Sequence, residues 1–247
     1  MSSTGRMGVG LLGDHPSGAV VAHALGAAGH QLTGRSVPHE DRVEQVEALL
    51  PGVPVLEMAE IVRRSELIIL AATGEALSQL VSQLESSGVG QAGQLVAHLS
   101  SDSGVEVLSL LAGQGLIPLR LYPMLPITGT SLDVTRLKGA WCAVSAPTPV
   151  LPIAQALAIE MGMEPLVIEP EQQVAFAQTV EHLQSSSVGF VKEAVDALEE
   201  AGLSNVAPAL TSLARAAVDS ALRERTLHGD VFGEAAELLS DAGLDDD

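Results

Sequence analysis

The residues best suited to bind a nucleotide lie near the amino terminus, in the stretch GLLGDHPSG at residues 10–18. In a dinucleotide-binding loop, G-x-G-x-x-G, the first glycine allows a tight turn and the second lets a pyrophosphate approach the backbone. The third glycine lets the next helix pack closely on the strand. Gly13 and Gly18 fit the first and third positions, whereas His15 stands at the second. The cofactor-binding residues expected in this loop are Gly13, Asp14, His15, Pro16, Ser17 and Gly18.

A capped structural turn is the alternative interpretation of this loop. Asp14 is a favourable N-cap for the following helix, with Pro16 in its first turn. As a cap, its carboxylate would occupy the electropositive position that a cofactor phosphate would use. A protonated His15 would partly offset this charge and could donate to a phosphate.

A second cofactor signal is TGRS, Thr33 to Ser36, at the end of the next expected strand. A site that prefers NAD places Asp or Glu at this position to hold the ribose hydroxyls. Here Arg35 could stack on adenine and bind a 2′-phosphate, with Ser36 donating to the same group, which is typical of NADP. The alternative is a lone surface arginine. Ala72 and Thr73, at the end of the strand at 66–72, are assigned to the same cofactor.

Candidate catalytic residues must lie at the carboxyl ends of strands or on the first long helix, where a nicotinamide would meet a substrate. Ser100 and Ser101 could hold a substrate carbonyl or carboxylate, or could instead cap the helix ahead of GVEVL. Tyr122 could donate a proton, or could be a buried tyrosine with one hydrogen bond.

Lys192 is the remaining catalytic candidate, as a general acid on the long helix. It follows His182 by ten residues, about 2.8 turns, so the two lie near one face. A solvated lysine is the alternative. His98 is expected to be a core histidine, and His228 lies in a turn with no assigned role. The spacing of His and acidic residues predicts no metal site.

An α/β domain is expected to position these residues, because apolar strands alternate with helical segments. This pattern predicts a doubly wound, mainly parallel sheet joined by right-handed crossovers. The expected strands are 7–12, 30–36, 53–58, 66–72, 94–100, 116–124 and 139–147. The expected helices between them are 18–30, with Gly29 as its C-cap, and 40–50, 58–65, 74–86 and 104–113.

The pattern becomes mainly helical after Pro147. VLPIAQALAIEMG predicts a helix and EPLVIEP a short strand, followed by helices at about 171–201, 206–224 and 230–242. We therefore expect a Rossmann-like domain over 1–146 and an all-helical domain over 147–247, ending in an acidic tail at 240–247.

The amino-acid composition excludes some classes of binding partner. Twelve basic and 31 acidic residues give a net charge of −19, which argues against nucleic acid or an anionic membrane as partner. Cys142 is the single cysteine, so no disulfide can form within the chain, and this suits a reducing cytoplasm. We find neither a signal-peptide pattern nor an apolar run long enough to span a membrane.

Five stretches carry a resemblance to a known family: AAGHQLTGRS, RRSELIILAATGEAL, GQLVAHLSSDSGVEVL, GLIPLRLYPMLPITGTSLDVTRLKGAWCAV and VLPIAQALAIEMGMEPLVIEPEQ. In order and spacing they resemble Rossmann-like proteins that carry the domain of unknown function 2520. These are relatives of pyrroline-5-carboxylate reductase and 6-phosphogluconate dehydrogenase. The resemblance implies an NADP-type cofactor across the strand ends, and a helical domain that closes the site and often pairs two subunits.

The departures from this family fall where chemistry is expected. The family loop is usually of the G-A-G-x-x-G type, against GDHPSG here, and its H-T-S-G is HLSS, His98 to Ser101. A usual His-Pro pair is Tyr122-Pro123. Usual His and Asn residues on the long helix align with Ala177 and Ser185. These four departures indicate relaxed or altered catalysis.

Two hypotheses follow. The first is an NADP-dependent oxidoreductase of the 6-phosphogluconate dehydrogenase-like class, a homodimer through its helical domain, that reduces a small keto acid or imine. The second is a non-catalytic, dimeric binding or regulatory protein that keeps the fold and has lost the cofactor.

Overall fold

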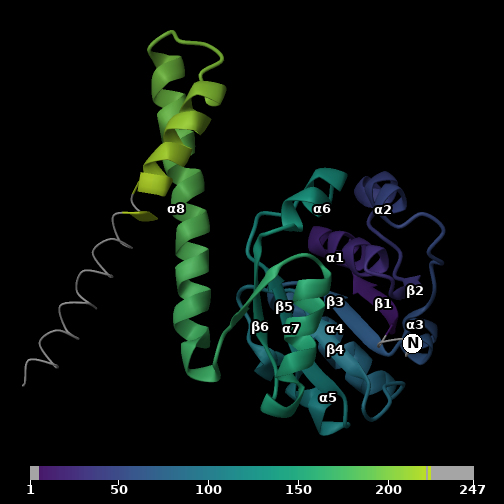
Figure 1. The fold of residues 1–247 in the computed structure, drawn as a ribbon. Coiled ribbons are helices and arrows are strands. Elements are labelled where there is room, and N and C mark those ends of the chain that lie inside the picture. The colour runs from purple at the N-terminus through teal and green to yellow at the C-terminus, as the bar shows by residue number, and fades with distance from the viewer. Residues whose placement is uncertain (1–5, 221, 224–247) are drawn as a thin grey trace, which may run out of the picture. The chain divides into compact units, whose positions relative to one another are not determined.

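The computed structural model describes residues 6–220, 222 and 223 of the 247-residue chain. Seven strands form one sheet in the order β2-β1-β3-β4-β5-β6-β7 (Figure 1). The strands are β1 (Gly8–Gly13), β2 (Gln31–Arg35), β3 (Leu67–Ala71), β4 (Leu95–His98), β5 (Ile117–Pro123), β6 (Trp141–Ser145) and β7 (Glu164–Val167). Every neighbouring pair is parallel except β5 and β6. The expected α/β class with a mainly parallel sheet is confirmed.

Helices cover both faces of this sheet (Figure 1). The described helices are α1 (Pro16–Ala27), α2 (Val43–Leu49), α3 (Met58–Arg64), α4 (Gly74–Ser87), α5 (Ser109–Gly113), α6 (Ser131–Leu137) and α7 (Leu151–Glu160), and the chain continues after β7 into α8 (Gln173–Glu200). Short 3-10 turns are η1 (Glu40–Arg42), η2 (Val105–Leu108), η3 (Thr148–Val150) and η4 (Pro170–Gln172).

Two apolar cores arise from the alternation of side chains along the strands. In β3, Leu67 and Ile69 join the core that also holds α1 and α7. Ile68 and Leu70 face the opposite core, formed with α3, α4 and α5. Because β3 is buried on both faces, its sequence is a continuous apolar run, as the sequence predicted.

The antiparallel pairing of β6 follows from where the chain leaves β5. Pro123 at the end of β5 stands opposite Cys142 near the start of β6, and Met124 N–H donates to the Trp141 carbonyl at 2.8 Å. The connection, which includes α6, therefore begins and ends at the carboxyl end of β5. For a parallel β6, the connection would have to run back to the amino end of β5 before the next strand began.

The strand predicted at 53–58 is wrong. This segment makes a single bridge, Arg35 to Val55, in which Arg35 N–H donates to the Pro54 carbonyl at 2.9 Å and Leu56 N–H donates to the Arg35 carbonyl at 3.0 Å. Pro54 has no N–H, so the ladder cannot extend through it.

The chain divides into two compact units after Glu181, later than the boundary expected at residue 146. The reason is that β7 pairs in parallel with β6 and extends the sheet. The second unit contains the rest of α8 and a helix over 207–220, within the range predicted as 206–224. The helix predicted at 230–242 and the acidic tail lie outside the described residues. No helix among the described residues is long and apolar enough to cross a membrane.

Candidate functional site

The strand order reverses beside β1, which has β2 on one side and β3 on the other. In open α/β sheets, ligands bind outside the carboxyl ends of the strands at such a point. Gly13 and Ala71 stand opposite each other at these two strand ends. The glycine loop identified in the sequence therefore lies where this fold places ligands.

Gly13 and Gly18 hold the positions expected of the first and third loop glycines. Gly13 has φ +92°, and an added Cβ would lie 2.9 Å from the carbonyl carbon of Ala71, with its oxygen closer still. At Gly18 an added Cβ would lie 2.9 Å from Leu11 Cδ1, with the Cβ of Ala71 closer still. The turn and the close approach of α1 to the sheet therefore both require glycine.

Two backbone N–H groups between these glycines form hydrogen bonds within the protein. Asp14 N–H and His15 N–H both donate to the carbonyl of Ala71, at 3.0 and 2.9 Å. The N-cap of α1 is His15, whose Nδ1 accepts from Ser17 N–H at 3.4 Å. Asp14 as N-cap is therefore wrong, because the tight turn places it one residue too early, whereas Pro16 does stand in the first turn.

His15 is neutral at pH 7. Burial and the charge of Arg42 lower its pKa below the usual 6.5. Its Nδ1 also lies 2.7 Å from the hydroxyl of Ser17. Burial and the nearby guanidinium therefore disfavour the protonated His15 that was expected to offset the charge of Asp14.

The carboxylate of Asp14 instead pairs with the start of the α2 region. Its Oδ2 accepts from His39 N–H at 2.9 Å and from the guanidinium of Arg42. Both side chains are partly buried, at 29% and 26% exposure. Arg42 was not identified from the sequence, where it is one charge in a helix-like stretch.

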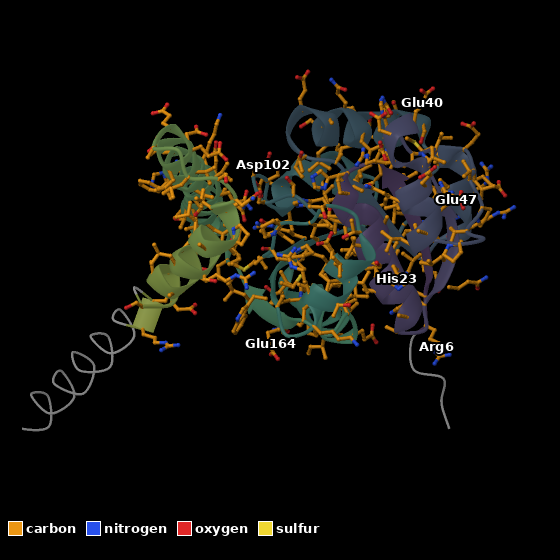
Figure 2. All side chains as sticks on the ribbon, turned by 90° about the horizontal axis from the view of Figure 1, so that it is seen from above. Arg6, His23, Glu40, Glu47, Asp102 and Glu164 are labelled. Carbon is orange, nitrogen blue, oxygen red and sulfur yellow. The ribbon has the colours of Figure 1, made fainter. Side chains whose placement is uncertain are left out.

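Arg35 is buried rather than on the surface, with 1% exposure. Its Nη2 pairs with Glu47 of α2, which lies at the surface in Figure 2. Its Nε and Nη1 are buried and have no hydrogen-bond partner among the described residues. Ser36, expected to donate to a phosphate, is half-buried, and its Oγ accepts from Gly13 N–H at 3.3 Å.

These groups enclose a small cavity of about 20 Å³. Its lining includes the loop residues Gly13, Asp14, His15 and Pro16, together with Arg35, Ser36, Arg42, Gln45 and Gly129. A space of this size holds about one water molecule. A phosphate group would require one of the lining side chains to move.

Asp102 joins the segments that follow β3 and β4, and it lies well apart from Glu47 in Figure 2. The Oδ2 of Asp102 accepts from Gly74 N–H at 3.1 Å, at the start of α4. Thr73 is the N-cap of α4 and is exposed, while Ala72 packs against the core. The two residues assigned to the cofactor after β3 thus lie beside an acid that the sequence left unassigned.

Ser100 is fully buried, and its hydroxyl donates to Asp102. Ser101 is half-buried. Neither serine caps a helix, because the N-cap of the following turn, η2, is Gly104 without a side-chain bond. His98 is buried as expected, and its Nδ1 accepts from Ser100 N–H at 3.2 Å.

Arg120 of β5 holds the loop after β4 in place. Its Nε and Nη2 donate to the carbonyls of Ser100 and Ser101 at 3.2 and 3.3 Å, and its Nη1 donates to Gln173. Its guanidinium lies 4.7 Å from the ring centre of Phe176, a cation–π distance. Burial lowers the pKa of Arg120 to about 10, so it stays charged at neutral pH. A lone arginine in LIPLRLYPM was the sequence signal that we did not use.

Tyr122 lies beside Arg120 with 9% exposure. Its ring packs edge-on against Phe176, with ring centres 6.3 Å apart, in a small core with Ala143 and Ile168. Its position matches the buried alternative, and a catalytic role stays a prediction.

Lys192, His182 and Ser185 are exposed residues of α8 in the second unit, so their roles at the strand ends stay predictions. Ala177 is half-buried in the first unit. His228 lies outside the described residues. Among those described, no three His, Cys, Asp or Glu residues are grouped so as to hold a metal ion.

A wider cavity of about 800 Å³ lies at the amino ends of the strands, beside Gly8, Gln31 and Glu66. These residues begin or precede strands, so this cavity is remote from Gly13 and Ala71. It does not take part in the candidate site.

The comparisons with known proteins agree with this architecture. Residues 2–123 match the model of the Rossmann-like domain, and residues 140–229 match the domain of unknown function DUF2520. No curated protein matches the chain.

Three solved structures illustrate the similarity of fold. A Bacteroides fragilis protein described as an NADP oxidoreductase has a TM-score of 0.70 at 16% identity, covering 95% of this chain and 92% of its own. The 1-pyrroline-5-carboxylate reductase of Streptococcus pyogenes has 0.63 at 14% identity, covering 96% and 92%. An imine reductase variant from Myxococcus stipitatus, in complex with NAD+, has 0.61 at 16% identity, covering 92% and 77%.

At such identities the likeness shows the fold, and the two family models confirm the resemblance stated from the sequence. The chain combines a Rossmann-like domain with a DUF2520 domain.

Proposed function

We propose that this protein binds NADP and is an oxidoreductase that reduces a C=O or C=N bond in a small keto acid or imine. The observation that carries the proposal is Arg35, a buried guanidinium at the end of β2 with two donors that have no partner in the part of the chain that the structure describes. A buried donor without an acceptor costs about 1–3 kcal/mol. An anion that accepts from Arg35 would relieve this cost, and NADP carries one in its 2′-phosphate.

The adenosine half of NADP fits the residues around Arg35. Gly13 and Gly18 permit the turn and the close helix approach that a dinucleotide site needs. Arg35 and Arg42 supply positive charge at the cavity wall, and Ser36 borders it. The middle of the loop fits less well, because His15 replaces a glycine.

The reacting half would lie at the ends of β3 and β4. Bound NADPH supplies a hydride, and the protein must position the substrate and provide a proton. Thr73, Ser101 and Asp102 are the polar side chains there with exposed surface. Tyr122 and Lys192 are the candidate proton donors. The reductases similar in fold, which act on pyrroline-5-carboxylate or imines, support the substrate class.

A non-catalytic dinucleotide-binding or regulatory protein is the second candidate. It is favoured by the full burial of Ser100 and the 9% exposure of Tyr122, which leave these hydroxyls little access to a substrate. Such a protein would bind NADPH and consume none of it with any keto acid or imine.

Calorimetric titration with NADPH and NADH tests the cofactor proposal. We expect NADPH to bind more tightly, and Arg35→Gln to weaken NADPH about 10- to 100-fold with little effect on NADH. Arg64→Gln is the matched control, since Arg64 is an exposed arginine of α3 paired with Glu60. Circular dichroism checks the fold of both variants. The absence of NADPH binding at millimolar concentration would refute the proposal.

A panel of cyclic imines and 2-keto acids separates the two candidates, with NADPH oxidation followed by absorbance. Turnover with one member supports the oxidoreductase. NADPH binding without turnover across the panel supports the non-catalytic protein.

We also propose that two copies pair through the second unit. Leu183, Phe190 and Val191 of α8 are 64%, 72% and 46% exposed, and their spacing of seven and eight residues places them on one face. Exposed apolar faces of this kind mark interaction surfaces. Phe190→Glu should halve the mass measured by light scattering, whereas Leu110→Glu, at a 52% exposed residue of α5, should not. A wild-type mass of one chain would contradict the pairing.

A further inference from the structure

The carboxylate of Asp14 is a negative charge in the lining of the candidate cofactor cavity. Its Oδ2 accepts from His39 N–H at 2.9 Å and from the guanidinium of Arg42. A phosphate oxygen would use the same two donors, a backbone N–H and a guanidinium. The carboxylate therefore stands in the position of a ligand anion.

Arg35 gives an independent sign that this cavity is built for an anion. It is 1% exposed, lines the same cavity as Asp14 and Arg42, and has Nε and Nη1 unpartnered among the described residues. Glu47 takes the remaining side of the guanidinium and is 53% exposed. Arg35 thus has more donors than the described residues provide acceptors for.

The cavity is too small for a phosphate group in this arrangement. About 20 Å³ remains between Arg35, Arg42 and the glycine loop, enough for one water molecule. Gly129 limits the other side, since an added Cβ there would lie 3.3 Å from Pro16 Cβ. Asp14 is the partly exposed side chain whose departure would both free Arg42 and open space.

We propose that Asp14 weakens NADP binding by holding Arg42 until the 2′-phosphate of the ligand takes its place. The 2′-phosphate of NADP can replace the carboxylate on Arg42 and reach the unpartnered donors of Arg35. NAD has a hydroxyl at this position and cannot replace a carboxylate. This inference rests on the proposed function, and it adds Arg42 as a group that binds the 2′-phosphate and Asp14 as the carboxylate that competes with it.

The test is a double-mutant cycle on cofactor affinity. Asp14→Asn removes the competing charge while keeping the size of the side chain, and should tighten NADPH binding about tenfold. NADH should change less than about threefold, because it lacks the phosphate that uses Arg42. In the Arg42→Gln background, Asp14→Asn should give no gain, since the donor for which both anions compete is gone.

Glu60→Gln is the matched control, because it removes one carboxylate from exposed ion pairs on α3. It should leave both affinities unchanged. Asp14→Ala serves as the second variant in case the asparagine keeps a hydrogen bond to Arg42. It should also tighten NADPH.

Thermal unfolding with inorganic phosphate gives a readout that does not depend on NADP. Phosphate should raise the melting temperature of Asp14→Asn more than that of the wild type, and Arg42→Gln should abolish the difference. If wild type and Asp14→Asn bind NADPH equally, the inference is overturned while the proposed function stands. If no variant binds NADPH but phosphate stabilises Asp14→Asn through Arg42, the anion position is supported and the proposed function fails. If no variant binds NADPH and phosphate stabilises all variants equally, both are overturned.

Discussion

Because His98 is buried, we expect the free energy of unfolding to decrease as the pH falls. His98 is 0% exposed, its Nε2 has no partner among the described residues, and burial together with Arg120 lowers its pKa to about 3. In the unfolded chain its pKa is about 6.5. Between these values the unfolded state binds more protons, so stability falls as the pH falls below 6.5. From pH 7 to pH 5 the loss is about 2 kcal/mol.

The measurement compares urea unfolding of the wild type and His98→Asn at pH 7 and pH 5. The asparagine oxygen can accept from Ser100 N–H as Nδ1 does, while the group no longer titrates. The fluorescence of Trp141, in the same unit, reports the transition. Carboxylates contribute little, because they titrate nearer pH 4.

We expect the wild type to lose about 2 kcal/mol more than His98→Asn between the two pH values, about 4–8 °C in melting temperature. His182→Asn, at an exposed residue of α8, should keep the wild-type dependence. Equal losses in the wild type and His98→Asn would refute the reasoning, since they would mean that His98 is protonated in the folded protein.

Three further predictions concern stability and reactivity. Gly13→Ala should lower the free energy of unfolding in urea by about 2–5 kcal/mol, because of the positive φ and the clash with Ala71. Gly88→Ala, at φ +61° with nothing within 4 Å, should lower it by about 1–2 kcal/mol. Equal losses in the two variants would contradict the clash. Asp133→Asn should lower the free energy of unfolding by about 2–3 kcal/mol, because the Oδ2 of Asp133 accepts from the N–H groups of residues 128–130. An unchanged melting temperature would show that these hydrogen bonds do not stabilise the fold. Cys142 is fully buried with its pKa raised to about 12, so a thiol reagent should modify it only after urea unfolding, and rapid native labelling would contradict this burial.

The sequence was sufficient for the elements that depend on local patterns. The apolar run at 66–72 became β3, because a strand buried on both faces needs apolar side chains throughout. Gly29 was expected as the C-cap of α1, but the C-cap is Ala28, and Gly29 follows it with φ +103°, the position where glycine is favoured after a helix. The segment at 53–58 failed because its apolar residues are interrupted by Pro54, which cannot extend the ladder.

The sequence alone also determined which residues make the turn after β1, because only glycine suits the backbone of Gly13 and the helix contact of Gly18. Tertiary structure decided what surrounds that turn. Arg35 is buried and pairs with Glu47 of α2, and Asp14 is paired because Arg42, 28 residues away, approaches it. Local propensity depends on neighbours in the chain, whereas burial and charge pairing depend on distant segments that meet only in the fold.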